Sequence, residues 1–355
     1  MPTGTLFPAS VIGSMPRSDF VKDLIMGDAD VSPEEYEKRM DAAVRYIVAV
    51  QEQAGIDVVT DGEWRRKSYI GVIAELAHGF ELSRAADGRP MTVVTERLAP
   101  KTPGFIAREV TFVKSITSKQ IKATLPSPAL LGERMWDAVK SAKAYPNRDD
   151  FVRDCVPVLR REAELLKEAG ADIIQIDDPH LCLFVDADVR SQYDDPDRAA
   201  DFAADMINQL VDGITGVKFA EHLCRRAGAR VRGDAGHQGC FDPIIGQLNR
   251  LNVQHITMEF TAPGSGDFEV LKQLREDFEI GLGCVDVMPG KIDDPETIAA
   301  RVRKAAAVID PKRITMNPDC GFAPGSGAVV PIDEAYQKLR NEAEAARMLR
   351  EEFGG

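Results

Sequence analysis

Residues 147–179, NRDDFVRDCVPVLRREAELLKEAGADIIQIDDP, decide the fold. Up to Gly170 the apolar residues recur at the spacing of an amphipathic helix, and the glycine ends that pattern. The run that follows is almost continuously apolar until it reaches Asp177 and Asp178. Such a run is typical of a strand buried on both faces of a parallel sheet, and a helix leading directly into it is the repeating unit of helix-covered sheets.

The same alternation continues through the chain. Amphipathic stretches cover 32–55, 293–308 and 331–353, and the first opens with Ser32 and Pro33, a good helix start. Eight short β-rich runs alternate with such stretches: ASVIGS (9–14), GIDVVTDGE (55–63), IKATLPS (121–127), GADIIQIDDP (170–179), GVKFAEHLC (216–224), QHITMEF (254–260), EIGLGCVDV (279–287) and RITMNPDCG (313–321). This count predicts an α/β fold, a (β/α)8 TIM barrel, in preference to an open doubly wound sheet.

One region fits the alternation poorly. Residues from about 70 to 120 read as an insertion between the second and third strands, a hairpin or small β-excursion. No internal repeat, low-complexity tract or linker is evident, so we expect residues 1–355 to form a single TIM-barrel catalytic domain.

Composition narrows the function. The net charge of −13 disfavours nucleic acid and anionic membrane surfaces as partners, because both would be repelled. No apolar run approaches the roughly 18 residues that span a bilayer, and the N-terminus lacks the layout of a signal peptide. We therefore expect a cytoplasmic enzyme with small-molecule partners, and the sequence leaves its oligomeric state open. In a reducing compartment its six cysteines are expected to be buried, metal-bound or catalytic.

Polar residues follow nearly every predicted strand, where barrels of this class place their chemistry. His222 and Cys224 lie two residues apart, so their side chains face the same side of a strand. Glu259 and Cys320 end two later strands, which completes a His/Cys/Glu/Cys set. One imidazole with two thiolates is a donor mixture that zinc prefers. The sequence therefore predicts a zinc site at His222, Cys224, Glu259 and Cys320.

Simpler interpretations stay open at this point. The pair His222–Cys224 alone is more often a packed strand pair than half of a metal site. His180 and His237 are rival ligands, although each is equally consistent with a loop histidine. The glycine-rich segments lack the ending of a phosphate-binding loop, and no G-x-S-x-G nucleophile elbow occurs.

The motifs VIGSMPR (11–17), DGE (61–63), IIQIDDP (173–179), HLC (222–224), TMEF (257–260) and NPDCGF (317–322) together resemble the C-terminal catalytic domain of cobalamin-independent methionine synthases. The resemblance spans residues 8 to 325, and the chain resembles the stand-alone, single-barrel form. The segment HLCRR…GCFDPI resembles the longer loop after strand 5 of such relatives.

The resemblance implies zinc held by His222, Cys224, Glu259 and Cys320, and methyl transfer to homocysteine. A free thiol, with a pKa of about 8.5, is mostly protonated at neutral pH, and zinc keeps it ionised and in place. Glu259, the hardest donor, is the natural ligand to be displaced by the substrate sulfur. The resemblance further implies that homocysteine contacts Ile12, Ser14, Glu63 and Asp177; the two acids could otherwise be paired with Arg17 or Arg66.

Departures from the family pattern fall on the side of the methyl donor. Met288 replaces a family histidine, Trp136 comes two residues late, and Ser68 replaces an acid. The donor, 5-methyltetrahydrofolate or another, therefore stays open. The main alternative is a relative that joins another thiol, such as coenzyme M, to an epoxide. Because coenzyme M carries a sulfonate and no ammonium group, Glu63 and Asp177 favour homocysteine. A zinc-free barrel that binds a small molecule is the third interpretation.

Overall fold

The structure of the protein is a computed structural model, which describes residues 5–27, 30–84, 90–225, 237–262, 264–323 and 330–354. The strands are β1 (Val58–Val59), β2 (Ala77–Arg84), β3 (Pro90–Pro100), β4 (Gln120–Pro126), β5 (Ile173–Asp177), β6 (Lys218–Leu223), β7 (His255–Glu259), β8 (Glu279–Val285) and β9 (Ile314–Pro318).

Helices connect the strands. The longer ones are α1 (Asp19–Met26), α2 (Pro33–Ala54), α4 (Ala107–Lys114), α5 (Pro128–Met135), α6 (Arg148–Glu168), α9 (Pro196–Val211), α12 (Pro295–Ala306) and α13 (Ile332–Phe353). The shorter ones are α3 (Ile73–Leu76), α7 (Pro179–Leu183), α8 (Ala187–Arg190), α11 (Ile245–Arg250), η1 (Asp242–Ile244), η2 (Phe268–Gln273) and η3 (Pro311–Arg313). Among the described residues, no helix is both long and apolar enough to span a membrane.

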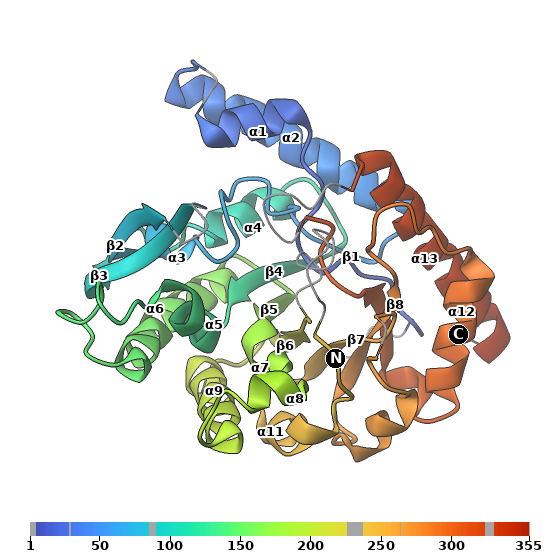
Figure 1. Cartoon of the computed structure of the whole chain (residues 1–355). Coiled ribbons are helices and arrows are strands. Elements are labelled where there is room, and N and C mark those ends of the chain that lie inside the picture. The colour runs from blue at the N-terminus through green and yellow to red at the C-terminus, as the bar shows by residue number, and fades with distance from the viewer. Residues whose placement is uncertain are drawn as a thin grey trace.

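Seven strands form one parallel sheet in the order β1-β4-β5-β6-β7-β8-β9. The sheet curls, and the long helices α2, α6, α9, α12 and α13 surround it (Figure 1). The segment expected as the first strand makes only two bridges, Ala9 to Met316 of β9 and Ser10 to Val58 of β1. Pro8 limits this pairing, because it accepts a bond from the Met316 amide but has no amide hydrogen to donate.

Residues 70–120, expected as an insertion, contain an antiparallel pair, β2 and β3, which is separate from the main sheet. Figure 1 places this pair at the edge of the molecule, beside α3 and α5. The strands β1 and β4 pair directly with each other, so neither β2 nor β3 enters the main sheet.

Local sequence explains the decisive unit at 147–179. Asn147 caps α6 by accepting a bond from the Asp150 amide. The apolar face of α6 is buried, and β5 is buried at every position. A strand with no exposed residue must be covered on both faces, which is why its sequence is apolar rather than alternating. Its carboxyl end carries Asp177, and the neighbouring strand β6 brings His222 opposite it.

Candidate metal and thiol site

His222, Cys224 and Cys320 lie together at the carboxyl end of the sheet. His222 is on β6, Cys224 follows this strand, and Cys320 follows β9. One potential ligand atom from each lies within 4.8 Å of the others, and the two Sγ atoms are 3.3 Å apart. All three residues are buried. Strands ending at the same edge of a parallel sheet thus unite residues that are 96 positions apart in the chain.

The imidazole of His222 is oriented by an acid. Its Nδ1 lies 2.8 Å from Oδ1 of Asp177, which also accepts a bond from Nε2 of Gln175 at 2.7 Å. The other nitrogen, Nε2, is buried and has no hydrogen-bond partner among the described residues. Burial alone lowers the pKa of His222, but the bond to Asp177 and its charge outweigh burial and raise the pKa above its usual value.

The two thiols influence each other. The contact with Cys224 and burial both raise the pKa of Cys320 well above its ordinary value. Without a nearby cation the Cys320 sulfur is therefore a neutral thiol. A bound divalent metal reverses this preference, because a coordinating thiol is deprotonated. An imidazole nitrogen without a partner beside two buried sulfurs fits such an ion chemically.

Glu259 ends β7 and is fully buried, but its carboxylate is not among the mutually close ligand atoms of the described group. Its Oε2 accepts a bond from the Arg225 amide at 2.8 Å. The Arg225 side chain in turn donates to the main-chain oxygens of Glu259 and Gly239. The structure thus brings three of the four expected ligands together and holds the fourth beside the residue that follows Cys224.

The expected substrate acids also reach this end of the sheet. Glu63 lies in the turn after β1 with a φ of 58°, an uncommon conformation for a residue other than glycine. Its Oε1 accepts a bond from the Thr124 hydroxyl at 2.8 Å. Burial raises the pKa of Glu63; Arg66 opposes this rise and Asp177 adds to it. The two acids are therefore close enough to repel each other, a setting that favours a positively charged ligand.

Ile12 and Ser14, the expected carboxylate-binding segment, are buried. The main-chain oxygen of Ser14 accepts a bond from Phe322, and its hydroxyl accepts one from Ala323 at 3.3 Å. A Cβ atom at Gly321 would collide with the Ser14 hydroxyl. The glycine after Cys320 therefore lets the first and last runs of the chain meet beside the thiols.

Neither alternative partner, Arg17 or Arg66, bonds to the side-chain carboxylate of Glu63 or Asp177 in the described structure. Arg17 donates to the main-chain oxygens of Glu63 and Arg66, whereas the Arg66 side chain binds Glu109 and Thr124. Of the rival ligands, His237 bonds to Asp186 at 3.2 Å and His180 stacks edge-on against Phe184. Neither belongs to the His/Cys/Cys group. Residues 226–236 of the loop after β6 lie outside the described residues.

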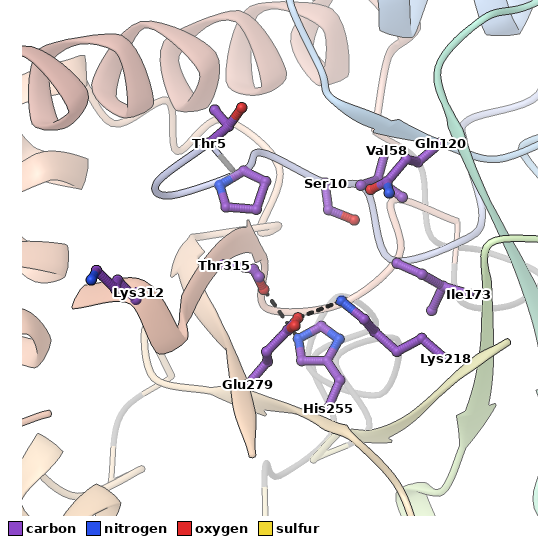
Figure 2. Close-up of a pocket in the computed structure, with 11 residues that line it drawn as sticks. Thr5, Ser10, Val58, Gln120, Ile173, Lys218, His255, Glu279, Lys312 and Thr315 are labelled. Atoms are coloured by element: carbon purple, nitrogen blue, oxygen red, sulfur yellow. Dashed lines mark hydrogen bonds and ion pairs between the residues drawn. The ribbon is translucent and has the colours of Figure 1, made fainter. Parts of the chain in front are cut away.

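A pocket lies at the opposite end of the sheet, where the strands begin (Figure 2). Lys218 and Glu279 form an ion pair of 2.6 Å there, and Nε2 of His255 lies 3.0 Å from the Thr315 hydroxyl. Burial, together with Lys122 and Lys218, lowers the pKa of His255 well below its usual value. This end offers neither of the two clustered thiols.

Sequence reasoning missed two contributors, Gln175 and Arg225. Gln175 lies two positions before Asp177, so the period of two in the strand IIQID indicates that both face the same side. The position of Arg225 directly after Cys224 could have indicated that it lies near the site. Its bonds to Glu259 and Gly239, however, depend on tertiary structure.

Known proteins resemble the chain over nearly its full length. The chain is 29% identical to a methionine synthase of Saccharolobus islandicus, over 98% of this chain and 96% of that protein. It is 28% identical to a methionine synthase of Sulfurisphaera tokodaii, over 98% and 94%. The fold is similar to that of a B12-independent methionine synthase from Shewanella sp. W3-18-1 solved with selenomethionine, with a TM-score of 0.79, 22% identity and coverage of 98% and 99%.

The match to a family model identifies the family of the chain. The model described as "Cobalamin-independent synthase, Catalytic domain" matches residues 7–348, which include every residue of the site described above. The chain therefore belongs to the cobalamin-independent synthase family and carries its catalytic domain.

Proposed function

We propose that this protein is a zinc-dependent transferase that moves a methyl group onto a thiol, with homocysteine as the favoured acceptor and methionine as the product. The observation that carries the proposal is the convergence of His222, Cys224 and Cys320, whose imidazole and thiol groups are donors that suit zinc. Nε2 of His222 is buried and has no hydrogen-bond partner among the described residues, so it is the nitrogen left to bind the ion. Family membership and relatives named methionine synthase support the acceptor.

In this proposal His222, Cys224 and Cys320 hold the zinc, and Glu259 is the fourth ligand that yields to the substrate. Bound zinc supplies positive charge that keeps the acceptor thiol ionised at neutral pH. The Arg225 amide holds Glu259 in place when it is not a ligand. Burial of the group excludes water, which protects the thiolate from competing proton transfer.

Ile12, Ser14, Glu63 and Asp177 would bind the amino-acid part of the acceptor. The charges of Glu63 and Asp177 act on each other, and neither arginine considered as a partner bonds to the Glu63 carboxylate in the described structure. An ammonium group would relieve their repulsion. A sulfonate-bearing thiol such as coenzyme M would be repelled, so the acids favour homocysteine over that alternative.

We further infer that the segment 9–14 acts as the eighth strand position and closes the sheet into a (β/α)8 barrel. Ala9 and Ser10 bridge to β9 and β1, the two edge strands of the sheet. Amide hydrogen exchange tests this inference. Protection of the Ser10 amide comparable with that of β1 is expected, whereas rapid exchange would contradict closure.

Zinc content of the purified protein, measured by elemental analysis beside Cys320→Ser, tests the main proposal. About one zinc per chain is expected, lost in the variant, with a new sulfur ligand in the X-ray absorption spectrum when homocysteine is added. Zinc without the new sulfur would point to another thiol. Absence of zinc would refute the proposal.

The Glu63→Gln variant tests the choice of acceptor. It removes a negative charge from the ammonium site, so homocysteine binding should weaken by about tenfold while zinc content stays unchanged. Unchanged homocysteine affinity would contradict the assignment of Glu63.

A further inference from the structure

We propose that Gln175 is a positioning residue for the metal-facing imidazole: through Asp177 it holds His222 in the tautomer that carries its proton on Nδ1, so that Nε2 faces the two thiols. The inference rests on the proposed function for its metal, but its geometry stands on three side chains of two neighbouring strands. Gln175 and Asp177 are on β5, and His222 is on β6.

A chain of hydrogen bonds links the three side chains. Gln175 Nε2 donates to Asp177 Oδ1 at 2.7 Å, and the same oxygen lies 2.8 Å from His222 Nδ1. A carboxylate oxygen can only accept, so the amide must present its NH₂ group and the imidazole its Nδ1–H. All three side chains are buried, which keeps water from competing for these bonds.

The two oxygens of Asp177 have different roles. Both bonds end on Oδ1, so Oδ2 is the oxygen left to face a substrate ammonium group. Without the bond from Gln175, the plane of the carboxylate could turn about its Cβ–Cγ bond, and neither oxygen would stay where Oδ1 meets the imidazole. Gln175 therefore fixes the plane in which Asp177 orients the ligand.

Gln175 has one further hydrogen-bonding atom, its amide oxygen. Its Oε1 is buried and has no hydrogen-bond partner among the described residues. A buried amide oxygen in that state is unfavourable for folding. The interaction that the side chain contributes at this position is therefore the bond from its nitrogen to Asp177.

The test compares Gln175→Met with Gln247→Met. Gln247 is also buried and its Nε2 also donates to an aspartate, Asp201, at 3.0 Å, but it lies on the outer helix α11. The zinc dissociation constant, measured by competition with a chelator, should rise about tenfold in Gln175→Met, within the range seen when supporting partners of ligands are removed. It should stay unchanged in Gln247→Met.

A second readout is independent of the metal. In zinc-free protein with ¹⁵N-labelled histidine, at a pH where the ring is neutral, the His222 signals should show a single Nδ1–H tautomer in the wild type. In Gln175→Met they should show a mixture with the Nε2–H form. Signals absent from His222→Phe identify the residue. If Gln175→Met fails to fold, Gln175→Leu replaces it.

The outcomes separate the two claims. An unchanged tautomer and an unchanged zinc affinity in a folded Gln175 variant would overturn the positioning role. A wild-type protein that binds no zinc would overturn the proposed function, and the tautomer would still decide the role of Gln175. The variants of Gln175 and Gln247 could instead lose thermal stability equally, with zinc affinity and the tautomer unchanged. Both glutamines would then have a structural role only, which would also overturn the inference.

Discussion

Two buried histidines on neighbouring strands have opposite environments. His222 lies near the carboxyl end of β6 beside an acid and two thiols, and its pKa is raised; His255 begins β7 beside lysines, and its pKa is lowered. In each ring one nitrogen is bonded and the other has no partner among the described residues. The residue type is therefore not enough to indicate function: the end of the strand and the charge of the neighbours separate the proposed ligand from the structural histidine.

The largest expected effect is on zinc binding, and it is tested by replacing the histidine at each end of the sheet with leucine. His222→Leu removes a ligand and should weaken zinc binding by more than about 100-fold, since even supporting residues contribute 10–100-fold. His255→Leu should leave the zinc dissociation constant within about twofold, because it lies at the other end of the strands. Chelator competition measures both. Equal losses in the two variants would remove the distinction between the ends.

Gly281 tests how tightly His255 is packed. A Cβ atom there would lie 2.7 Å from His255 Nε2, 2.6 Å from Thr257 Oγ1 and 2.8 Å from Asn317 Oδ1. Gly281→Ala should therefore lower the free energy of unfolding by about 2 kcal/mol, as overpacking in a core does. Urea unfolding measures the loss. Gly246→Ala is the matched control, because nothing lies within 4 Å of its added Cβ and it is in a helix, so it should be neutral or stabilising.

The two histidines should change the free energy of unfolding in opposite directions when the pH falls. The folded protein keeps His255 neutral, whereas the unfolded chain takes up a proton near pH 6.5, so His255 makes the free energy of unfolding fall as the pH drops below that value. The contribution reaches at most about 1.4 kcal/mol per pH unit. In zinc-free protein, His255→Leu should therefore flatten the loss of stability between about pH 6.5 and pH 5 in urea unfolding.

His222 should act in the opposite direction. Its pKa is raised in the folded state, so its contribution to stability is fully present below the unfolded pKa and is lost as the pH rises through the folded one. His222→Leu should therefore steepen the loss of stability in acid. Identical pH profiles for the two variants would contradict the assigned environments.

The smallest expected effect concerns the ion pair of the pocket. Lys218 and Glu279 are each about one-fifth exposed, 22% and 20%. Lys218→Gln should lower the free energy of unfolding by at most about 1 kcal/mol, because water screens such pairs. Zinc content should not change. A loss of zinc in this variant would show that the two ends are coupled.

Most of the architecture could be predicted from pattern. The helix–glycine–strand unit at 147–179 and its repetition identified seven strands of the main sheet, because a strand covered on both faces must be apolar throughout. The first run was harder, since Ser10 and its neighbours satisfy the strand pattern yet pair at only two positions. Propensity does not report how far a partner strand extends, although Pro8, which has no amide hydrogen, was a visible sign that pairing would be limited there.

For the site, the sequence by itself determined residue chemistry: the spacing of His222 and Cys224, and the polar residues at the ends of strands. Tertiary structure alone decided which of them meet. It gathered Cys320 with His222 and Cys224, left the Glu259 carboxylate bonded to the Arg225 amide, and directed Asp177 to the imidazole of His222. The physical reason is that strand order and register, set by packing across the whole sheet, fix distances between residues far apart in the chain.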